Sequence, residues 1–238
     1  MIKKLSLIFF LFVSLHLTGQ QNYIQYTVKD GLPQMLCTKI IQDHKGYIWI
    51  GTKWGLSKYD GISFKNYFIN NGLTDSNIID IKEGENDDIW ILTSNGLSVI
   101  KNDQIKYFPA PKGLLFKDDN LVVNGKNIWI IEGYYNQKLI KFHDKIYEEK
   151  YTVSKGRLTG LSFDHERNKI VFTEVNNIGS KLYSFNGNSL EIESQAKGSK
   201  LIFNHRNRLA IKSTNKKTIV YKSSQKDTLQ LLKFSHFL

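Results

Sequence analysis

The feature that most constrains the fold is a repeat of 41 residues near the start of the chain. A Gly-Leu pair, an Ile-Trp-Ile triplet and a Gly-Leu-Ser triplet recur at that constant offset, at residues 31–32, 48–50 and 55–57 and again at 72–73, 89–91 and 96–98. Each unit also holds four short apolar runs separated by turn residues, which is typical of a four-stranded propeller blade. The sequence therefore predicts an all-β fold, a β-propeller of four-stranded blades.

The turns divide the chain into about five blades. Asp60-Gly61 and Asn186-Gly187 are dipeptides that favour two-residue hairpin turns, and they hold the same place in two of the units. The expected propeller domain covers residues 21–238, with blades at about 31–71, 72–112, 113–155, 156–197 and 198–238.

Residues 23–28 resemble the last strand of a blade, such as Phe64–Phe68, and they precede the first repeat. We expect an outer strand there, although the fifth unit already has a fourth strand of its own. The segment either pairs as a fifth strand or belongs to a longer ring. An open arc would expose strand edges and blade faces, which native proteins avoid. We therefore favour an incomplete ring or the N-terminal part of a larger propeller.

Three tryptophans mark the centre of the second strand in the first three units: Trp49, Trp90 and Trp129. We interpret these rings as core that packs one blade against the next, because buried aromatic rings dominate core energetics. Val171 and Ala210 stand at that place in the last two units, which predicts less regular blades there.

Two glycines and one cysteine complete the structural predictions. Gly55 and Gly96 hold the same position in the first two units and are interpreted as structural residues. Cys37, the single cysteine, excludes an internal disulfide. It aligns with Ile78 of the next unit, so we expect it to be a buried small apolar residue.

The first twenty residues have the layout of a secretory signal. Lys3 and Lys4 precede an apolar run from Leu5 to Leu17, and residues 18–21 are small or polar. The run is short for a membrane span, although an uncleaved anchor is the alternative. We expect cleavage near residues 19–21, a periplasmic or secreted location, and no membrane span in the mature chain.

The net charge of +11 is concentrated at one end of the chain. Residues 198–238 hold nine Lys or Arg and one acid, Asp227. Such a surface attracts anionic partners, but a solvated face that keeps the protein in solution is the alternative. Export argues against nucleic acid as a partner.

Residues 31–33, 41–52 and 55–61 together resemble the two-component regulator propeller repeat. The first unit matches that pattern almost throughout, and the second and third units keep the Ile-Trp-Ile triplet. The resemblance implies the periplasmic sensor propeller of a hybrid two-component system, whose output domains would lie outside this sequence. Because the repeat consensus is structural, the resemblance supplies no binding residue.

The residues contain no catalytic constellation and imply no cofactor. His44, His165 and His205 occupy equivalent turns in different blades, so a shared metal site is not expected. Asp43 follows the first strand, where an aspartate typically accepts hydrogen bonds from turn amides. We expect no enzyme activity in this chain.

Binding is the better functional class, because loops on a rigid scaffold commonly carry recognition. Aromatic rings beside Asn and Lys suit carbohydrate, although the rings could merely cover neighbouring blades. The candidate ligand-binding residues lie between the second and third strands of three units: Lys53, Trp54, Ser94, Asn95, Tyr134, Tyr135 and Asn136. The leading hypothesis is a ligand-sensing propeller that binds an oligosaccharide or another, related periplasmic ligand. A protein-interaction scaffold and, less favoured, a polysaccharide-active enzyme are the alternatives.

Overall fold

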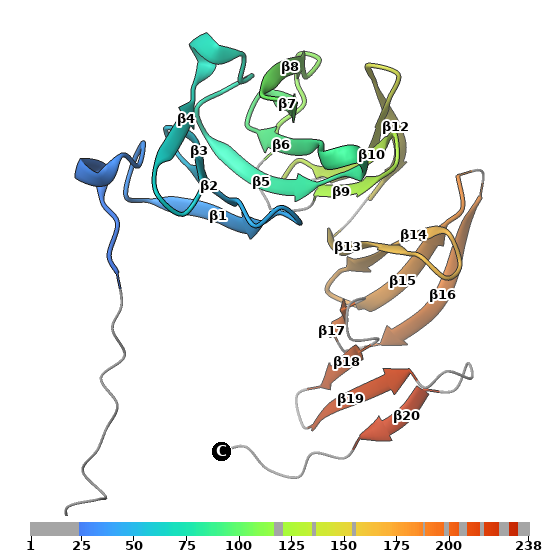
Figure 1. Ribbon diagram of the computed structural model, residues 1–238. Coiled ribbons are helices and arrows are strands. Elements are labelled where there is room, and N and C mark those ends of the chain that lie inside the picture. The colour runs from blue at the N-terminus through green and yellow to red at the C-terminus, as the bar shows by residue number, and fades with distance from the viewer. Residues whose placement is uncertain are drawn as a thin grey trace, which may run out of the picture.

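Five four-stranded antiparallel sheets make up the protein in this computed structural model. The structure describes residues 24–116, 121–134, 137–153, 156–187, 189–197, 200–204, 209–214, 217–223 and 229–232. The predicted all-β fold of propeller blades is confirmed. The sheets follow one another along an arc, and the first and last sheets do not meet to close a ring (Figure 1).

Each sheet is formed by four strands that are consecutive in the chain, and we number the sheets as blades. Blade 1 contains β1 (Cys37–Gln42), β2 (Ile48–Thr52), β3 (Gly55–Tyr59) and β4 (Phe64–Tyr67). Blade 2 contains β5 (Ile78–Glu83), β6 (Ile89–Thr93), β7 (Gly96–Lys101) and β8 (Gln104–Pro109). Blade 3 contains β9 (Leu121–Asn124), β10 (Asn127–Glu132), β11 (Lys138–His143) and β12 (Ile146–Thr152).

The last two blades repeat this order. Blade 4 contains β13 (Arg157–Asp164), β14 (Lys169–Val175), β15 (Gly179–Phe185) and β16 (Leu190–Lys197). Blade 5 contains β17 (Lys200–Asn204), β18 (Leu209–Thr214), β19 (Lys217–Ser223) and β20 (Leu229–Leu232). The first strands of successive blades, β1, β5, β9, β13 and β17, lie next to one another around the inside of the arc.

The blades pack face to face through their apolar side chains. Trp49 is 2% exposed and, with Leu56 and Tyr67 of blade 1, packs against buried isoleucines of blade 2. Trp129 occupies the corresponding place between blades 3 and 4. Trp90 is half-buried beside the cluster between blades 2 and 3. The tryptophans therefore lie at the seams between blades.

Two glycines permit the hairpins that follow these tryptophans. Gly55 and Gly96 have φ values of +140° and +136°, a region that side chains disfavour. A Cβ atom would lie 2.8 Å from the Tyr67 carbonyl oxygen at Gly55 and 2.4 Å from the Phe108 carbonyl oxygen at Gly96. Each glycine thus lets the third strand start close to the fourth.

One carboxylate on the innermost strand of blade 2 connects three blades. Asp80 is fully buried, and its Oδ1 pairs with Lys39 Nζ of blade 1 at 3.0 Å. Its Oδ2 accepts a hydrogen bond of 3.2 Å from the Leu121 amide of blade 3. Both oxygens of this buried carboxylate are therefore satisfied by neighbouring blades.

The outer strand expected at residues 23–28 is a wrong prediction for residues 24–28; residue 23 lies outside the described residues. Residues 24–27 form no strand, and Val28–Asp30 form a 3-10 helix, η1. The Asp30 carboxylate accepts hydrogen bonds from the Thr27 amide (2.7 Å) and hydroxyl (2.8 Å), and Gly31 ends the turn at φ +112°. These local bonds favour a turn, and the described strands offer residues 24–27 no ladder partner.

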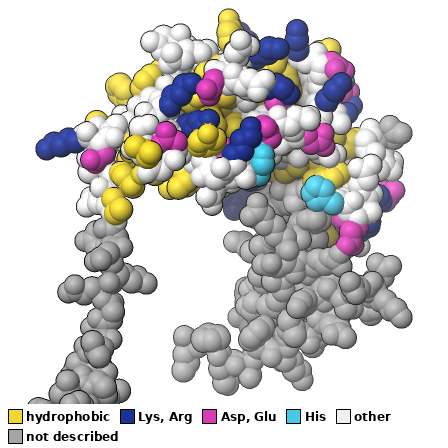
Figure 2. Space-filling model, in the orientation of Figure 1, with side chains coloured by type: hydrophobic (Ala, Val, Ile, Leu, Met, Phe, Trp, Pro, Cys, Tyr) yellow, Lys and Arg dark blue, Asp and Glu magenta, His cyan; other side chains and the backbone are white. Residues whose placement is uncertain are grey.

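Cys37 also differs from the prediction, because it is exposed. Its equivalent, Ile78, is 1% exposed since blade 1 covers it. No described blade precedes blade 1, so the same position there faces solvent. Hydrophobic side chains accordingly gather at the lower left of the coloured surface in Figure 2, over the N-terminal part of the described chain.

The predicted signal sequence, residues 1–20, lies outside the described residues. Within the described ranges, no helix is long and apolar enough to span a bilayer.

Candidate functional site

The predicted binding residues lie on hairpin turns at one end of the second strands. Lys53 and Trp54 join β2 to β3, and the Trp54 side chain is 66% exposed. The Thr52 hydroxyl shapes this turn: it donates to the Gly55 carbonyl at 2.8 Å and accepts from the Trp54 amide at 3.0 Å. The Trp54 ring is therefore held on a short, bonded turn and faces solvent.

The second blade repeats that turn. Thr93 donates to the Gly96 carbonyl at 3.1 Å and accepts from the Asn95 amide at 3.3 Å. Ser94 accepts a hydrogen bond of 2.7 Å from the Asn77 side-chain amide. Ser94 and Asn95 thus hold the same place in blade 2 as Lys53 and Trp54 hold in blade 1.

The third turn, between β10 and β11, is longer. Tyr134 is 58% exposed, while Tyr135 and Asn136 lie outside the described residues. Buried Gln137 anchors the turn, because its side chain donates to the Gly133 carbonyl at 3.0 Å and accepts from the Leu158 amide at 2.6 Å. Since all three turns follow equivalent second strands, they lie on the same face of the arc.

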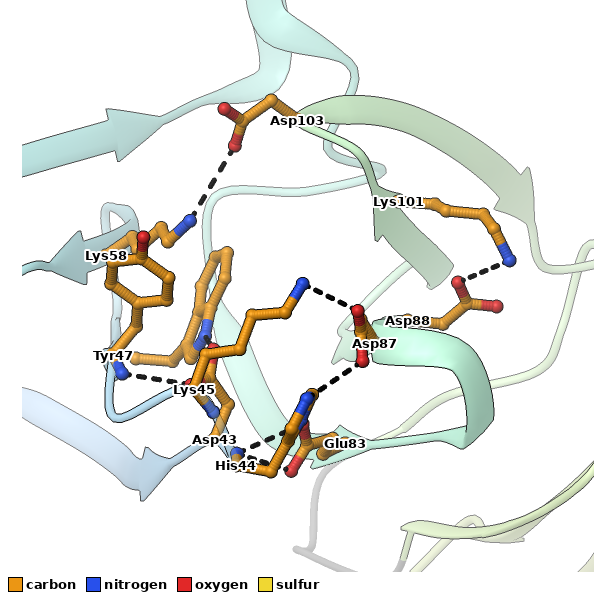
Figure 3. Close-up of polar contacts among 11 residues, drawn as sticks. Asp43, His44, Lys45, Tyr47, Lys58, Glu83, Asp87, Asp88, Lys101 and Asp103 are labelled. Atoms are coloured by element: carbon orange, nitrogen blue, oxygen red, sulfur yellow. Dashed lines mark hydrogen bonds and ion pairs between the residues drawn. The ribbon is translucent and has the colours of Figure 1, made fainter.

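A pocket lies at the opposite ends of these strands, between blades 1 and 2. Its cavity volume is about 200 Å³. It is lined by Asp43, His44, Lys45, Tyr47, Trp49, Lys58, Glu83, Asp87, Ile89, Ile100, Asn102 and Asp103. None of the predicted binding residues lines it. The pocket is the polar rim of the seam that the Trp49 ring fills. Figure 3 shows the charged side chains of this rim.

Asp43 organises the blade 1 side of the pocket. Its Oδ1 accepts hydrogen bonds from the amides of Lys45 (3.0 Å) and Tyr47 (2.9 Å), and its Oδ2 accepts one from Trp49 Nε1 (2.7 Å). The expectation that Asp43 bonds turn amides is confirmed. The same carboxylate also fixes the orientation of the tryptophan ring.

His44 bridges the two blades. Its ring contacts the Glu83 carboxylate through Nδ1, and its Nε2 lies 3.0 Å from Asp87 Oδ1. The hydrogen bond to Glu83 raises the pKa of His44 above its ordinary value. Lys45 Nζ lies 2.6 Å from the other oxygen of Asp87, and this hydrogen bond lowers the pKa of Asp87.

Lys58 of β3 lines the pocket between Tyr47 and Asp103. Its ammonium lies 3.8 Å from the centre of the Tyr47 ring, which is within the range of a cation–π contact. Asp103 of blade 2 lies 3.9 Å from Lys58 Nζ and 3.1 Å from Lys65 Nζ. The hydrogen bond from Lys65 lowers the pKa of Asp103.

These contacts make the pocket a cluster of ion pairs between blades 1 and 2, which we call the charged clasp. Basic side chains come from blade 1 and acidic side chains come from blade 2, about one repeat further along the chain. Sequence reasoning missed this arrangement. The signal that could have found it is the opposite charge of positions 44, 45 and 65 against positions 83, 87 and 103. Within the described part of the chain, no three His, Cys, Asp or Glu side chains are placed to hold a metal ion.

The chain was compared with known proteins. The family model "Two component regulator propeller" matches residues 31–54. Histidine kinase P4 of Formosa agariphila is 42% identical over 65 residues, which are 26% of this chain and 5% of that protein. The matched part therefore spans a small fraction of the kinase.

Solved structures show the same fold at low identity. The inactive H270A virginiamycin B lyase from Staphylococcus aureus, solved with quinupristin, superposes with a TM-score of 0.55 and 15% identity, over 90% of this chain and 74% of that chain. The Dos1 propeller gives a TM-score of 0.55 and 15% identity, over 84% and 59% of the two chains. The resemblance predicted from the first unit is confirmed: the chain carries a two-component regulator propeller repeat at residues 31–54.

Proposed function

We propose that this chain is part of a non-catalytic sensor propeller of a two-component system, exported to the periplasm, that binds an oligosaccharide or a related ligand. The observation that carries the proposal is the propeller repeat at residues 31–54, together with 42% identity to a histidine kinase over 65 residues. Because those 65 residues span 5% of the kinase, the signalling output is part of the proposal.

The ligand would contact the face that carries the hairpin turns. Trp54 and Tyr134 present rings that are 66% and 58% exposed, and flat exposed rings suit stacking on sugar rings. Lys53, Ser94 and Asn95 add donors and acceptors for hydroxyl groups on the same face. In the same proposal, Tyr135 and Asn136 extend this surface from the third turn.

Calorimetry with oligosaccharides selected on a glycan array tests this proposal. We expect Trp54→Ala and Tyr134→Ala to weaken binding at least about tenfold, because each removes a stacking ring. Ile146→Ala is the control, since Ile146 is 58% exposed and follows the β11–β12 turn, at the opposite end of the strands from the three hairpin turns. A folded chain that binds no glycan, or equal losses in all three variants, would contradict the proposal.

A protein-interaction scaffold is the second candidate. Two features favour it: the strongly basic unit 198–238, and the exposed apolar face of blade 1 on which Ile40 is 59% exposed. Capture of one dominant protein that is lost after charge reversal at Lys216 and Lys217 would favour the scaffold over the sugar sensor. The structural likeness to a lyase keeps a polysaccharide-active enzyme as a third candidate, which turnover abolished by a single carboxylate substitution would establish.

A further inference from the structure

The pocket between blades 1 and 2 has no role in the function proposed above, because it lies at the opposite ends of the strands from the hairpin turns. Its cavity volume of about 200 Å³ exceeds that of an engineered cavity of about 150 Å³ that binds benzene. It is smaller than the pockets of about 300–1,000 Å³ that hold drug-sized molecules. A ligand of this pocket would therefore be a small molecule, close in size to one aromatic ring with a single substituent.

The acidic side chains that line this pocket already have partners. Each accepts a hydrogen bond from the protein or forms an ion pair with it: Asp43, Glu83, Asp87 and Asp103. Asp103 pairs with Lys65 through Oδ2 (3.1 Å) and accepts a hydrogen bond from the Tyr67 hydroxyl through Oδ1 (3.2 Å). A cationic ligand would therefore have to displace a basic side chain of the protein itself.

Lys58 differs from the other charged groups of the pocket, because its ammonium has no close partner. The Lys58 side chain is only 19% exposed, and the nearest carboxylate oxygen, Asp103 Oδ1, lies 3.9 Å from Nζ, which is too far for a hydrogen bond. Its closest contact is the Tyr47 ring, whose centre lies 3.8 Å from Nζ. Among the residues that the structure describes, none accepts a hydrogen bond from this ammonium. A largely buried charge without hydrogen bonds is costly unless a further partner binds it.

Two neutral side chains of the same pocket can also donate hydrogen bonds. Tyr47 of blade 1 carries a hydroxyl group, and Asn102 on the β7–β8 turn of blade 2 carries an amide. In the described part of the chain, neither group has a hydrogen-bond partner. The donors that remain unused therefore come from both blades, with one positive charge among them.

These unused donors match a single carboxylate. Its one negative charge would balance Lys58, and its two oxygens accept hydrogen bonds from ammonium, hydroxyl and amide groups, of which the charge-assisted bonds are the strongest. A dianion such as phosphate fits less well, because its second charge would lie among carboxylates with no further cation to balance it. The deepest wall of the pocket is apolar and is formed by buried residues of the seam: Trp49, Ile89 and Ile100. The rest of the ligand should therefore be small and uncharged.

We propose that the pocket between blades 1 and 2 binds a small organic monocarboxylate, whose carboxylate lies between Lys58 and Asn102. The Tyr47 hydroxyl supplies a third donor. Because Lys58 belongs to blade 1 and Asn102 to blade 2, the bound ligand joins the two blades beside the charged clasp. Binding to the folded chain alone also raises its stability. The proposal does not depend on the ligand suggested for the hairpin turns.

Isothermal titration calorimetry of the full chain with benzoate and benzamide tests the proposal from the side of the ligand. The two probes share a ring and differ in charge. We expect benzoate to bind and benzamide to bind at least about tenfold more weakly, because benzamide cannot form the charge-assisted hydrogen bond to Lys58. Phosphate should bind more weakly than benzoate. Absence of benzoate binding, equal affinity for benzoate and benzamide, or tighter binding of phosphate would each overturn the proposal.

Three variants test the proposal from the side of the protein. Lys58→Met keeps most of the apolar stem and removes the charge, so it should weaken benzoate binding at least about tenfold. Asp103→Asn should strengthen binding about twofold to fivefold, because it removes a negative charge 3.9 Å from Lys58 Nζ. Lys101→Met is the matched control and should leave the affinity unchanged, since Lys101 is 52% exposed, pairs with Asp88 and does not line the pocket.

The urea midpoint supplies an independent readout. Benzoate should raise the midpoint of the wild type and leave that of Lys58→Met unchanged. Equal weakening of binding by Lys58→Met and Lys101→Met would indicate a general attraction to positive charge and would overturn the proposal. Should Lys58→Met fail to fold, Asp103→Asn decides: weaker or unchanged binding of benzoate to this variant would overturn the proposal as well.

Discussion

Blades 1 and 2 are built from the same sequence pattern but are buried to different extents. Both have an Ile-Trp-Ile second strand and a register shift at the same place in the first strand, between Cys37 and Lys39 and between Ile78 and Asp80. Nevertheless Ile40 is 59% exposed, and its equivalent Ile81 is fully buried. The difference comes from the neighbour and not from the local sequence. In a repeat fold, stability is shared between each unit and its interfaces, so a blade at the end of an arc lacks one interface.

The largest expected effect is on the free energy of unfolding, and it should distinguish these two isoleucines. Ile81→Ala should lower the free energy of unfolding by about 2–5 kcal/mol, because it leaves a cavity in a packed seam. Ile40→Ala should change it by no more than about 0.5 kcal/mol, as is usual for exposed positions. Urea unfolding of the two variants measures both changes. Equal losses would show that blade 1 is covered as fully as blade 2.

A second test sharpens the comparison at the seam itself. A Cβ atom on Gly51 would lie 2.6 Å from Ile78 Cγ2. Gly51→Ala should therefore destabilise the chain by about 1–3 kcal/mol through overpacking. The same substitution in an Ile78→Ala background should cost less, because the clashing methyl group is gone. An identical cost in both backgrounds would mean that the contact between β2 and β5 is looser than the structure shows.

The smallest expected effect is the pH dependence of the charged clasp. The folded pKa of His44 lies above its unfolded value, because His44 bonds to Glu83. Its contribution to stability is therefore complete below the unfolded pKa of a histidine, and it is lost as the pH rises through the raised folded pKa. The stability difference between wild type and His44→Gln should shrink as the pH rises through this window, as followed by urea midpoints. The effect is small because the pair is exposed and screened by solvent, and a difference that grows with pH would contradict it.

Much of the fold was predictable because the strands and turns are local features repeated at a constant offset. The positions of Trp49, Trp90 and Trp129 on second strands and the bonding of Asp43 to turn amides followed from such patterns. The exposure of Cys37 did not follow from the sequence. The repeat places Cys37 and Ile78 at equivalent positions, and only the presence of a preceding blade differs between them.

The candidate sites were less predictable for a related reason. The clasp around His44 joins two units, so its partners become visible only when the turns of successive blades are superposed in space. The turn at residues 28–30 was missed because a strand-like pattern was outweighed by two short hydrogen bonds that the Asp30 carboxylate accepts from Thr27. The role of Trp54 and Tyr134 in ligand binding stays a prediction.

The Asp80 carboxylate has a consequence for how the molecule opens. One oxygen is held by blade 1 and the other by blade 3, at 3.0 and 3.2 Å. Detaching either neighbour would remove the partner of one oxygen of this buried carboxylate, and breaking a buried charged pair in this way is costly. The first three blades should consequently exchange their slowest amide protons together, as one cooperative unit, while a chain lacking this side chain would release the flanking blades separately.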